Sequence, residues 1–264
     1  MNQNNFFYKV WRVIYPLILY FLMDVIIVWL VETLVLAFVP QYAEGSASTI
    51  VNIPSTATIV FLIVSIIVNY QLYKKDYNGW TVWIYKKPQY FLLLLLIGAL
   101  ASHGLSALIS LMNIDSIIGS YTQIEDSVFS ANAVFVILQT VILAPISEEL
   151  LFRGLIYKRI SLYMENFWGP ALISSALFGL YHFNLAQGVF AFLFGLLACA
   201  SYDKIHNLWV PMTLHIGGNL LSVIMVYTGF TYTQTWIYIT VMILCLVIAF
   251  LLYHFLIRPT KKYT

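Results

Sequence analysis

The sequence predicts an all-α protein that crosses a membrane about eight times, and three observations carry this prediction. Apolar residues make up 61% of the chain and charged residues only 9%, whereas about a quarter of the residues in a soluble domain are charged. The mean hydropathy is +0.87. The apolar residues also gather into stretches of about the 20 residues that a spanning helix needs, separated by short polar connections.

Eight apolar stretches are predicted to be spanning helices. Lys9 and Arg12 precede the first stretch, as in a signal peptide. That stretch is too long for a cleaved signal and lacks a small-residue cleavage site, so we expect a retained span. The fifth stretch is short, and it could be a half-span that turns back inside the bilayer with the sixth. The predicted spans are 13–38, 56–73, 89–112, 131–152, 169–182, 186–204, 209–227 and 235–257.

The basic residues give an independent prediction of topology. If the chain crosses eight times, all 13 Lys and Arg residues fall on one side of the membrane. Because cytoplasmic connections are enriched in Lys and Arg, both termini are predicted to be cytoplasmic. The segment 77–87, with Trp80 and Trp83 between lysine pairs, is predicted to lie at the cytoplasmic interface. The basic residues are Lys9, Arg12, Lys74, Lys75, Lys86, Lys87, Arg153, Lys158, Arg159, Lys204, Arg258, Lys261 and Lys262.

Domain organisation is predicted to be simple, with residues 1–264 forming one membrane domain. The chain shows no internal repeat and no long linker. Cys199 and Cys245 lie inside apolar stretches, so no disulfide framework is expected. The net charge of +2 without a basic cluster argues against a nucleic-acid partner.

Four polar residues of the first three spans have two readings. Asp24, Glu32, Asn69 and His103 each lie in a predicted span. Each could be functional, because polar groups in a bilayer are costly. The alternative, hydrogen bonding between helices or a position near a span end, is as consistent with the sequence and more common.

The stretch 144–154, which closes the fourth predicted span, carries three charged residues: Glu148, Glu149 and Arg153. A charge near the bilayer centre costs a few kcal/mol, and neighbouring carboxylates also repel. A sequence that retains both is expected to use them. Glu149 and Arg153 are four residues apart and can pair on one helix face, while Glu148 projects about 100° away.

Three further polar residues are predicted to lie at a depth similar to that of the carboxylates. The helical rise is about 1.5 Å per residue. If the cytoplasmic interface lies near Lys158, Glu148 is about 15 Å deep, and if the fifth span starts at Trp168, His182 is about 20 Å deep. If the seventh span starts near Trp209, His215 and Asn219 lie roughly 9 and 15 Å from the cytoplasmic interface by the same rise, and they share one helix face. We expect these groups to face one cavity open to the cytoplasm, with Ser147 and Ser174 as minor companions.

Hydrolysis is the chemistry that such a cavity would support. A buried carboxylate can act as a general base toward water, and imidazole and carboxamide groups can hold the oxyanion that forms. Arg153 would keep Glu149 ionised and fixed while Glu148 transfers the proton. Each feature alone also has a structural reading: an ion pair at a helix end, a snorkelling carboxylate, or polar bridges between helices.

These motifs resemble the CAAX-protease and bacteriocin-processing (CPBP, or Abi) family. The resemblance rests on Glu148-Glu149-x-x-x-Arg153, Phe178-x-x-x-His182 and His215-x-x-x-Asn219 on successive spans, and covers about 130–230. Gly195 and the stretch 207–211 are also in the family's style. The family comprises intramembrane endopeptidases related to the type II CAAX prenyl endopeptidase.

The resemblance implies proteolysis by a water that Glu148 activates, with His182 and His215 as catalytic companions and Asn219 at the oxyanion. Glu149 and Arg153 would be the supporting pair. Both glutamic and metalloprotease mechanisms have been assigned to the family. Glu148, His182 and His215 would be the zinc ligands in a metal mechanism, but no HExxH motif is present and a carboxylate base needs no metal, which favours a metal-independent reaction.

The implied substrate is a membrane-associated peptide or lipoprotein. Relatives process prenylated C-termini, or are associated with peptide pheromones, bacteriocins and self-immunity. The compact chain, without an organelle-targeting segment, favours a bacterial plasma membrane. Two other functions remain open: a non-catalytic immunity partner that binds a peptide, and a proton-coupled transporter, for which the expected paired broken helices in repeated halves are not found.

Overall fold

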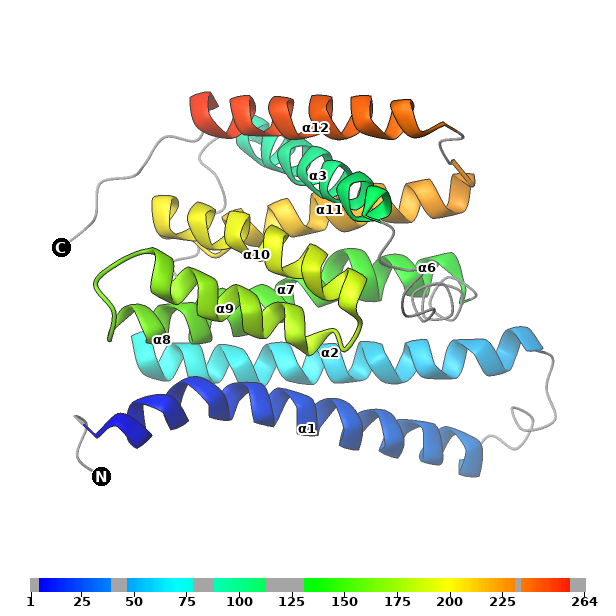
Figure 1. Ribbon diagram of the computed structural model, residues 1–264. Coiled ribbons are helices and arrows are strands. Elements are labelled where there is room, and N and C mark those ends of the chain that lie inside the picture. The colour runs from blue at the N-terminus through cyan, green and yellow to red at the C-terminus, as the bar shows by residue number, and fades with distance from the viewer. Residues whose placement is uncertain (1–4, 39–46, 78–87, 113–130, 231–233, 257–264) are drawn as a thin grey trace. The chain divides into compact units, whose positions relative to one another are not determined.

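The computed structural model describes residues 5–38, 47–77, 88–112, 131–230 and 234–256, and these segments are almost entirely helical, with no strand among them (Figure 1). The all-α prediction is confirmed for this part of the chain. The predicted interfacial residues 78–87, with Trp80 and Trp83, lie outside the described residues.

Seven helical segments of the described chain are long and apolar enough to cross a membrane. The helix between the fourth and sixth of the predicted spans, α9 (Trp168–Tyr181), has only 14 residues, as the short fifth stretch predicted. The chain is therefore a multi-pass membrane protein, while the cytoplasmic location of its termini stays a prediction. The seven candidate spans are Phe6–Phe38, Ile53–Tyr77, Tyr90–Leu111, Ala133–Ser161, Leu185–Ile205, Trp209–Thr228 and Thr235–His254.

The chain divides into two compact units, residues 1–80 with 123–163 and residues 81–122 with 164–264. We call them unit 1 and unit 2. Each is described by itself below. The predicted family region 130–230 contributes residues to both units. The prediction of a single domain over 1–264 stays a prediction.

Unit 1 packs two long helices against one continuous helical run. The helices are α1 (Phe6–Phe38) and α2 (Ala47–Tyr77). They pack against each other, and α2 also contacts most of the run. The run consists of α6 (Ala133–Val136), the π-helix η2 (Ile137–Leu143), α7 (Ala144–Glu149), the π-helix η3 (Leu150–Tyr157) and α8 (Lys158–Ser161).

The fourth span was predicted to end too early. It was expected over 131–152, with Arg153, Lys158 and Arg159 beyond its end, but the helical run continues to Ser161. Arg153 and Arg159 are fully buried within it. A hydropathy profile ends a predicted span at a charged residue, because an isolated charge inside the membrane is costly. Here both guanidinium groups have carboxylate partners, Glu149 and Asp76.

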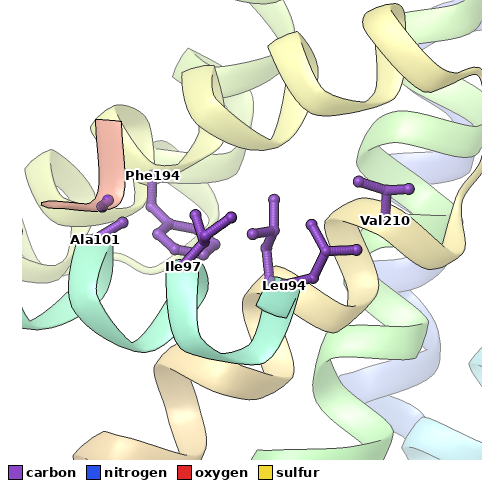
Figure 2. Packing of buried hydrophobic residues seen from close by; sticks show 7 residues of the cluster. Leu94, Ile97, Ala101, Phe194 and Val210 are labelled. Atoms are coloured by element: carbon purple, nitrogen blue, oxygen red, sulfur yellow. The ribbon is translucent and has the colours of Figure 1, made fainter. Parts of the chain in front are cut away.

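Unit 2 is built on α3 (Pro88–Leu111), which packs against α11 (Trp209–Thr228) and α12 (Thr235–Leu256). The helices α9 and α10 (Leu185–Ile205) pack together, and α10 also contacts α3 and α11. Figure 2 shows the apolar core to which α3, α10, α11 and α12 contribute. Its buried members are Leu94, Ile97, Ala101, Phe194, Val210, Leu214 and Ala249.

Glycines let α3 and α11 approach backbone to backbone. A Cβ atom on Gly98 would collide with the carbonyl oxygen of Leu214, and one on Gly217 with the carbonyl oxygen of Leu95. Small residues allow such close contact between membrane helices, where dispersion replaces the hydrophobic effect as the main attraction. This contact sets the rotation of α11 and therefore the direction of its polar residues.

Candidate catalytic residues

The two glutamates lie at the end of α7, a short α-helical piece between two π-helical segments. Pro145 stands near the start of α7. A proline inside a helix removes one backbone donor and its ring crowds the preceding turn. The wide turns of η2 end at Leu143, two residues before Pro145. Wide π-turns inside helices occur frequently at functional sites.

Glu149 and Arg153 form a fully buried ion pair. Arg153 Nη1 donates to Glu149 Oε1 at 2.9 Å, and both side chains are 0% exposed. The residues are four apart across η3, where each residue turns the helix by roughly 82°, so the two side chains still share a face within about 30°. The sequence prediction of this pair is confirmed.

Glu148 has a different environment from its neighbour. Its side chain is partly exposed, whereas Glu149 has no exposed surface. A carboxylate base must reach water and substrate, and a supporting carboxylate must stay fixed. The difference in burial fits the predicted division of roles between the two residues.

His182 ends α9, and its ring is anchored to the last turn of that helix. The ring nitrogen Nδ1 lies 2.8 Å from the carbonyl oxygen of Phe178. A carbonyl oxygen can only accept, so Nδ1 carries the proton and Nε2 holds the lone pair of the neutral ring. The chain then reverses through Phe183, in a left-handed conformation with φ 52°. Asn184 caps α10 by accepting from the Gln187 amide at 3.0 Å.

His215 lies on α11 against the same phenylalanine that contacts His182. The Phe178 ring centroid is 6.0 Å from the His215 ring and 5.0 Å from the His182 ring, both edge to face. The ring centroid of Phe194, a member of the apolar core, lies 5.5 Å from that of His215. His215 is 8% exposed. Unit 2 therefore brings the two predicted catalytic histidines to one aromatic side chain.

Asn219 lies one turn after His215 on α11 and is partly exposed. Gly217 and Gly218 stand between them. Gly217 packs on the α3 backbone, and a Cβ on Gly218 would come within 2.9 Å of Ser102 Cβ. The His-Ile-Gly-Gly-Asn motif therefore combines two polar residues on one face with two glycines on the face that packs against α3.

The predicted catalytic set is shared between the units. Unit 1 carries Glu148, Glu149 and Arg153, and unit 2 carries His182, His215 and Asn219. Their convergence on one cavity stays a prediction. Within neither unit do the described residues include three His, Cys, Asp or Glu side chains placed to hold a metal ion. The alternative zinc set also draws on both units, so metal dependence stays untested.

Sequence reasoning missed the partners of Ser147 and of Arg159. Ser147 Oγ lies 2.5 Å from Ser65 Oγ and 3.2 Å from the Tyr20 hydroxyl. Asp76 contacts Arg159 at 2.8 Å. The signal available in the sequence was the spacing of Ser65, Asn69 and Asp76, which places the three polar residues along one face of α2.

The other polar residues singled out in the sequence differ in burial. Asn69 is buried on α2, at 1% exposure, and Ser174 is fully buried on α9. Asp24, Glu32 and His103 are partly exposed on α1 and α3. Nothing in these positions assigns them to the catalytic set.

Comparison with known proteins gives two matches. Residues 130–221 match the family described as type II CAAX prenyl endopeptidase Rce1-like. A protein of Bacillus subtilis (strain 168) named "Putative membrane peptidase YdiL" is 32% identical over 105 residues, which cover 39% of this chain and 42% of that relative. The alignment thus spans less than half of either protein. No solved structure matches the chain significantly.

The family match covers the helices that carry the candidate residues. All six of them, from Glu148 to Asn219, fall inside residues 130–221. Together the two comparisons support a membrane protease in general terms. Through residues 130–221, the chain is therefore similar to the family described as type II CAAX prenyl endopeptidase Rce1-like.

Proposed function

We propose that the chain is an intramembrane endopeptidase in which Glu148 activates the hydrolytic water. The observation that carries the proposal is the contrast within one turn of helix: a partly exposed Glu148 directly precedes Glu149, which is fully buried and paired with Arg153 at 2.9 Å. In this arrangement one carboxylate is partly exposed and the other is held in place by Arg153. It lies inside the family segment 130–221.

In the proposed reaction, Glu148 removes a proton from water as the water oxygen bonds to the carbonyl carbon of the scissile peptide. The carbonyl oxygen becomes an oxyanion. The proton on Glu148 then passes to the peptide nitrogen as the C–N bond breaks, which releases an amine and a carboxylic acid and restores the base. General-base catalysis of this kind contributes typically 10²–10⁴-fold, and oxyanion donors contribute a similar factor.

The unit 2 residues supply the donors in this proposal. The Asn219 carboxamide donates to the oxyanion, and His215 and His182 act as its companions. The His182 ring is oriented by the hydrogen bond from Nδ1 to the Phe178 carbonyl, 2.8 Å away. Because Nδ1 carries a proton, Nε2 accepts a hydrogen bond when the ring is neutral and donates one when the ring is protonated. Glu149 and Arg153 act on Glu148 through the position of the helix.

The proposed substrate is a membrane-associated peptide or lipoprotein, cleaved at a site that opens to the cytoplasm of a bacterial cell. Peptide pheromone or bacteriocin maturation, self-immunity and CAAX-type processing are the substrate classes considered. The reaction is proposed to be metal-independent. Should zinc be used, Glu148, His182 and His215 are the residues that would hold it, and it would polarise the carbonyl and activate the water.

The test compares cells that carry the wild type or Glu148→Gln at matched membrane levels. The ends of small membrane-associated and secreted peptides are sequenced in both. The matched control is Glu165→Gln, the same chemical change at an exposed residue between α8 and α9. We expect a peptide that is cut in wild-type and Glu165→Gln cells and intact in Glu148→Gln cells.

Two results would contradict the proposal. Peptide ends that are the same in all three strains would argue against proteolysis. If the Glu148→Gln strain also kept its phenotype, a non-catalytic peptide-binding role would be favoured. Cleavage that persists in Glu148→Gln cells would show that another group is the base.

A further inference from the structure

Two sets of polar contacts join the helical run of unit 1 to α1 and α2, one on each side of its glutamates. The first is the buried hydroxyl cluster of Tyr20, Ser65 and Ser147, one residue from each of α1, α2 and α7. Ser147 Oγ lies 2.5 Å from Ser65 Oγ and 3.2 Å from the Tyr20 hydroxyl, and all three side chains are fully buried. A serine hydroxyl has one proton and two lone pairs, so Ser147 can hold both partners at once.

The second set lies at Arg159, at the other end of the segment. Arg159 is fully buried and donates through all three guanidinium nitrogens. Nε donates to Asp76 Oδ2 at 2.8 Å, Nη1 to the Arg12 carbonyl oxygen at 2.5 Å, and Nη2 to the Tyr15 hydroxyl at 3.0 Å. Asp76 in turn holds Arg12 at 3.1 Å. Charge-assisted bonds of this kind are the stronger class of hydrogen bond.

Ser147 and Arg159 lie on one face of their helical run, as Ser65 and Asp76 do on α2, only because η3 is a π-helix. On α2, Ser65 and Asp76 are 11 residues apart, about 1,100° of α-helical rotation, which puts them within about 20° of one face. Ser147 and Arg159 are 12 residues apart, which in an α-helix would separate them by about 120°. With eight of the steps in η3 at roughly 82° each, the rotation is about 1,056°, within about 24° of three full turns.

The Glu149–Arg153 pair lies on the side of the helix away from these contacts. By the same count, Glu149 lies about 200° and Arg153 about 170° around the helix from Ser147, on the opposite side. The polar contacts therefore lie on the face opposite Glu149 and Arg153. They fix the rotation of the segment that carries them.

We infer that Ser65, Tyr20 and Asp76 are positioning residues, which act through Ser147 and Arg159 to set the direction of Glu148. The inference rests on the proposed function for its catalytic meaning. It assigns a role to α1 and α2, which lie outside the family segment 130–221. These helices present the family's glutamates to the substrate.

The first measurement needs no substrate. In a Glu148→Cys background, membranes are treated with a small maleimide, and alkylation of each cysteine is followed by peptide mass spectrometry. We expect Ser65→Ala to change the alkylation rate at position 148 several-fold. Ser65→Thr, which keeps the hydroxyl, should restore it. The matched control is Ser161→Ala, because Ser161 is exposed and donates to Lys158 O of its own helix at 2.8 Å.

Cys199 serves as an internal monitor of folding, because it is fully buried in unit 2. A change at position 148 with Cys199 still protected supports positioning. Faster alkylation at both positions would mean general unfolding and would overturn the inference. So would an unchanged rate at 148, or a Ser65→Thr variant that behaves like Ser65→Ala.

The second measurement follows, in cells, the peptide whose cleavage requires Glu148. With the native Glu148, Ser65→Ala is expected to lower the cleavage rate by about tenfold, because misplacement of a catalytic group by 1 Å can cost up to 10²-fold. Asp76→Asn should act in the same direction. Absence of any Glu148-dependent cleavage refutes the proposed function, while the alkylation result decides the positioning independently. Normal cleavage in Ser65→Ala refutes the positioning alone.

Discussion

Replacing Arg153 by methionine tests the energetic role of the buried pair. Methionine keeps an unbranched apolar stem and removes the guanidinium group with its charge. Glu149 and Arg153 are both 0% exposed and in contact at 2.9 Å, so the change leaves a carboxylate without its cation in a buried site. Breaking a buried pair in this way costs about 3–5 kcal/mol. That is a large part of a typical stability of about 5–15 kcal/mol.

The assay is an SDS titration of the purified protein in mixed micelles, followed by circular dichroism. The predicted loss corresponds to a decrease of roughly 10²- to 10³·⁵-fold in the folding equilibrium constant. The double variant Glu149→Gln/Arg153→Met should recover most of the loss, since it buries no isolated charge. Arg12→Met is the control for a less buried pair, with 27% and 12% side-chain exposure, and should cost roughly 1 kcal/mol or less.

The reasoning is refuted if the double variant is no more stable than Arg153→Met alone. A coupling free energy below about 0.5 kcal/mol in the double-mutant cycle would refute it as well.

The pair also has a predicted effect on activity. At matched amounts of folded protein, Arg153→Ala should lower peptide cleavage because it releases Glu149, and unchanged cleavage would contradict the supporting role.

Two further predictions concern packing and metal. Gly217→Ala should destabilise the protein by about 1–3 kcal/mol, because the new Cβ collides with the Leu95 carbonyl and forces α3 and α11 apart. The same SDS titration measures this, with Leu220→Ala, 37% exposed on α11, as the control; equal stability of wild type and Gly217→Ala would contradict the close contact. Treatment of the purified protein with a chelator should leave cleavage intact, whereas a loss that zinc restores would establish a metal mechanism.

The helical spans could be predicted closely because the bilayer leaves little choice. Backbone polar groups in hydrocarbon must be paired internally, so an apolar stretch of about 20 residues becomes a helix. The prediction 209–227 corresponds to Trp209–Thr228, and 186–204 to Leu185–Ile205. The short fifth stretch corresponds to α9, of 14 residues.

The end of the fourth span could not be predicted from hydropathy. The sequence suggested the local Glu149–Arg153 pair because four residues separate its members on one helix. It did not suggest the distant Asp76–Arg159 pair, which buries a second arginine and lets the run continue to Ser161. The depth of about 15 Å expected for Glu148 also assumed an α-helical rise, and the wide turns of η3 shorten it.

The sequence by itself determined the class, the approximate spans and the Glu149–Arg153 pair, because composition and short spacings are local properties. Only the tertiary structure decided which distant residues contact each other. Ser147 meets Tyr20 across 127 residues and Ser65 across 82, and His182 and His215 meet at Phe178. Such contacts depend on which helices pack and on how far π-turns rotate a segment. Hydropathy and periodicity do not encode these quantities, because both are averages over neighbours in the chain.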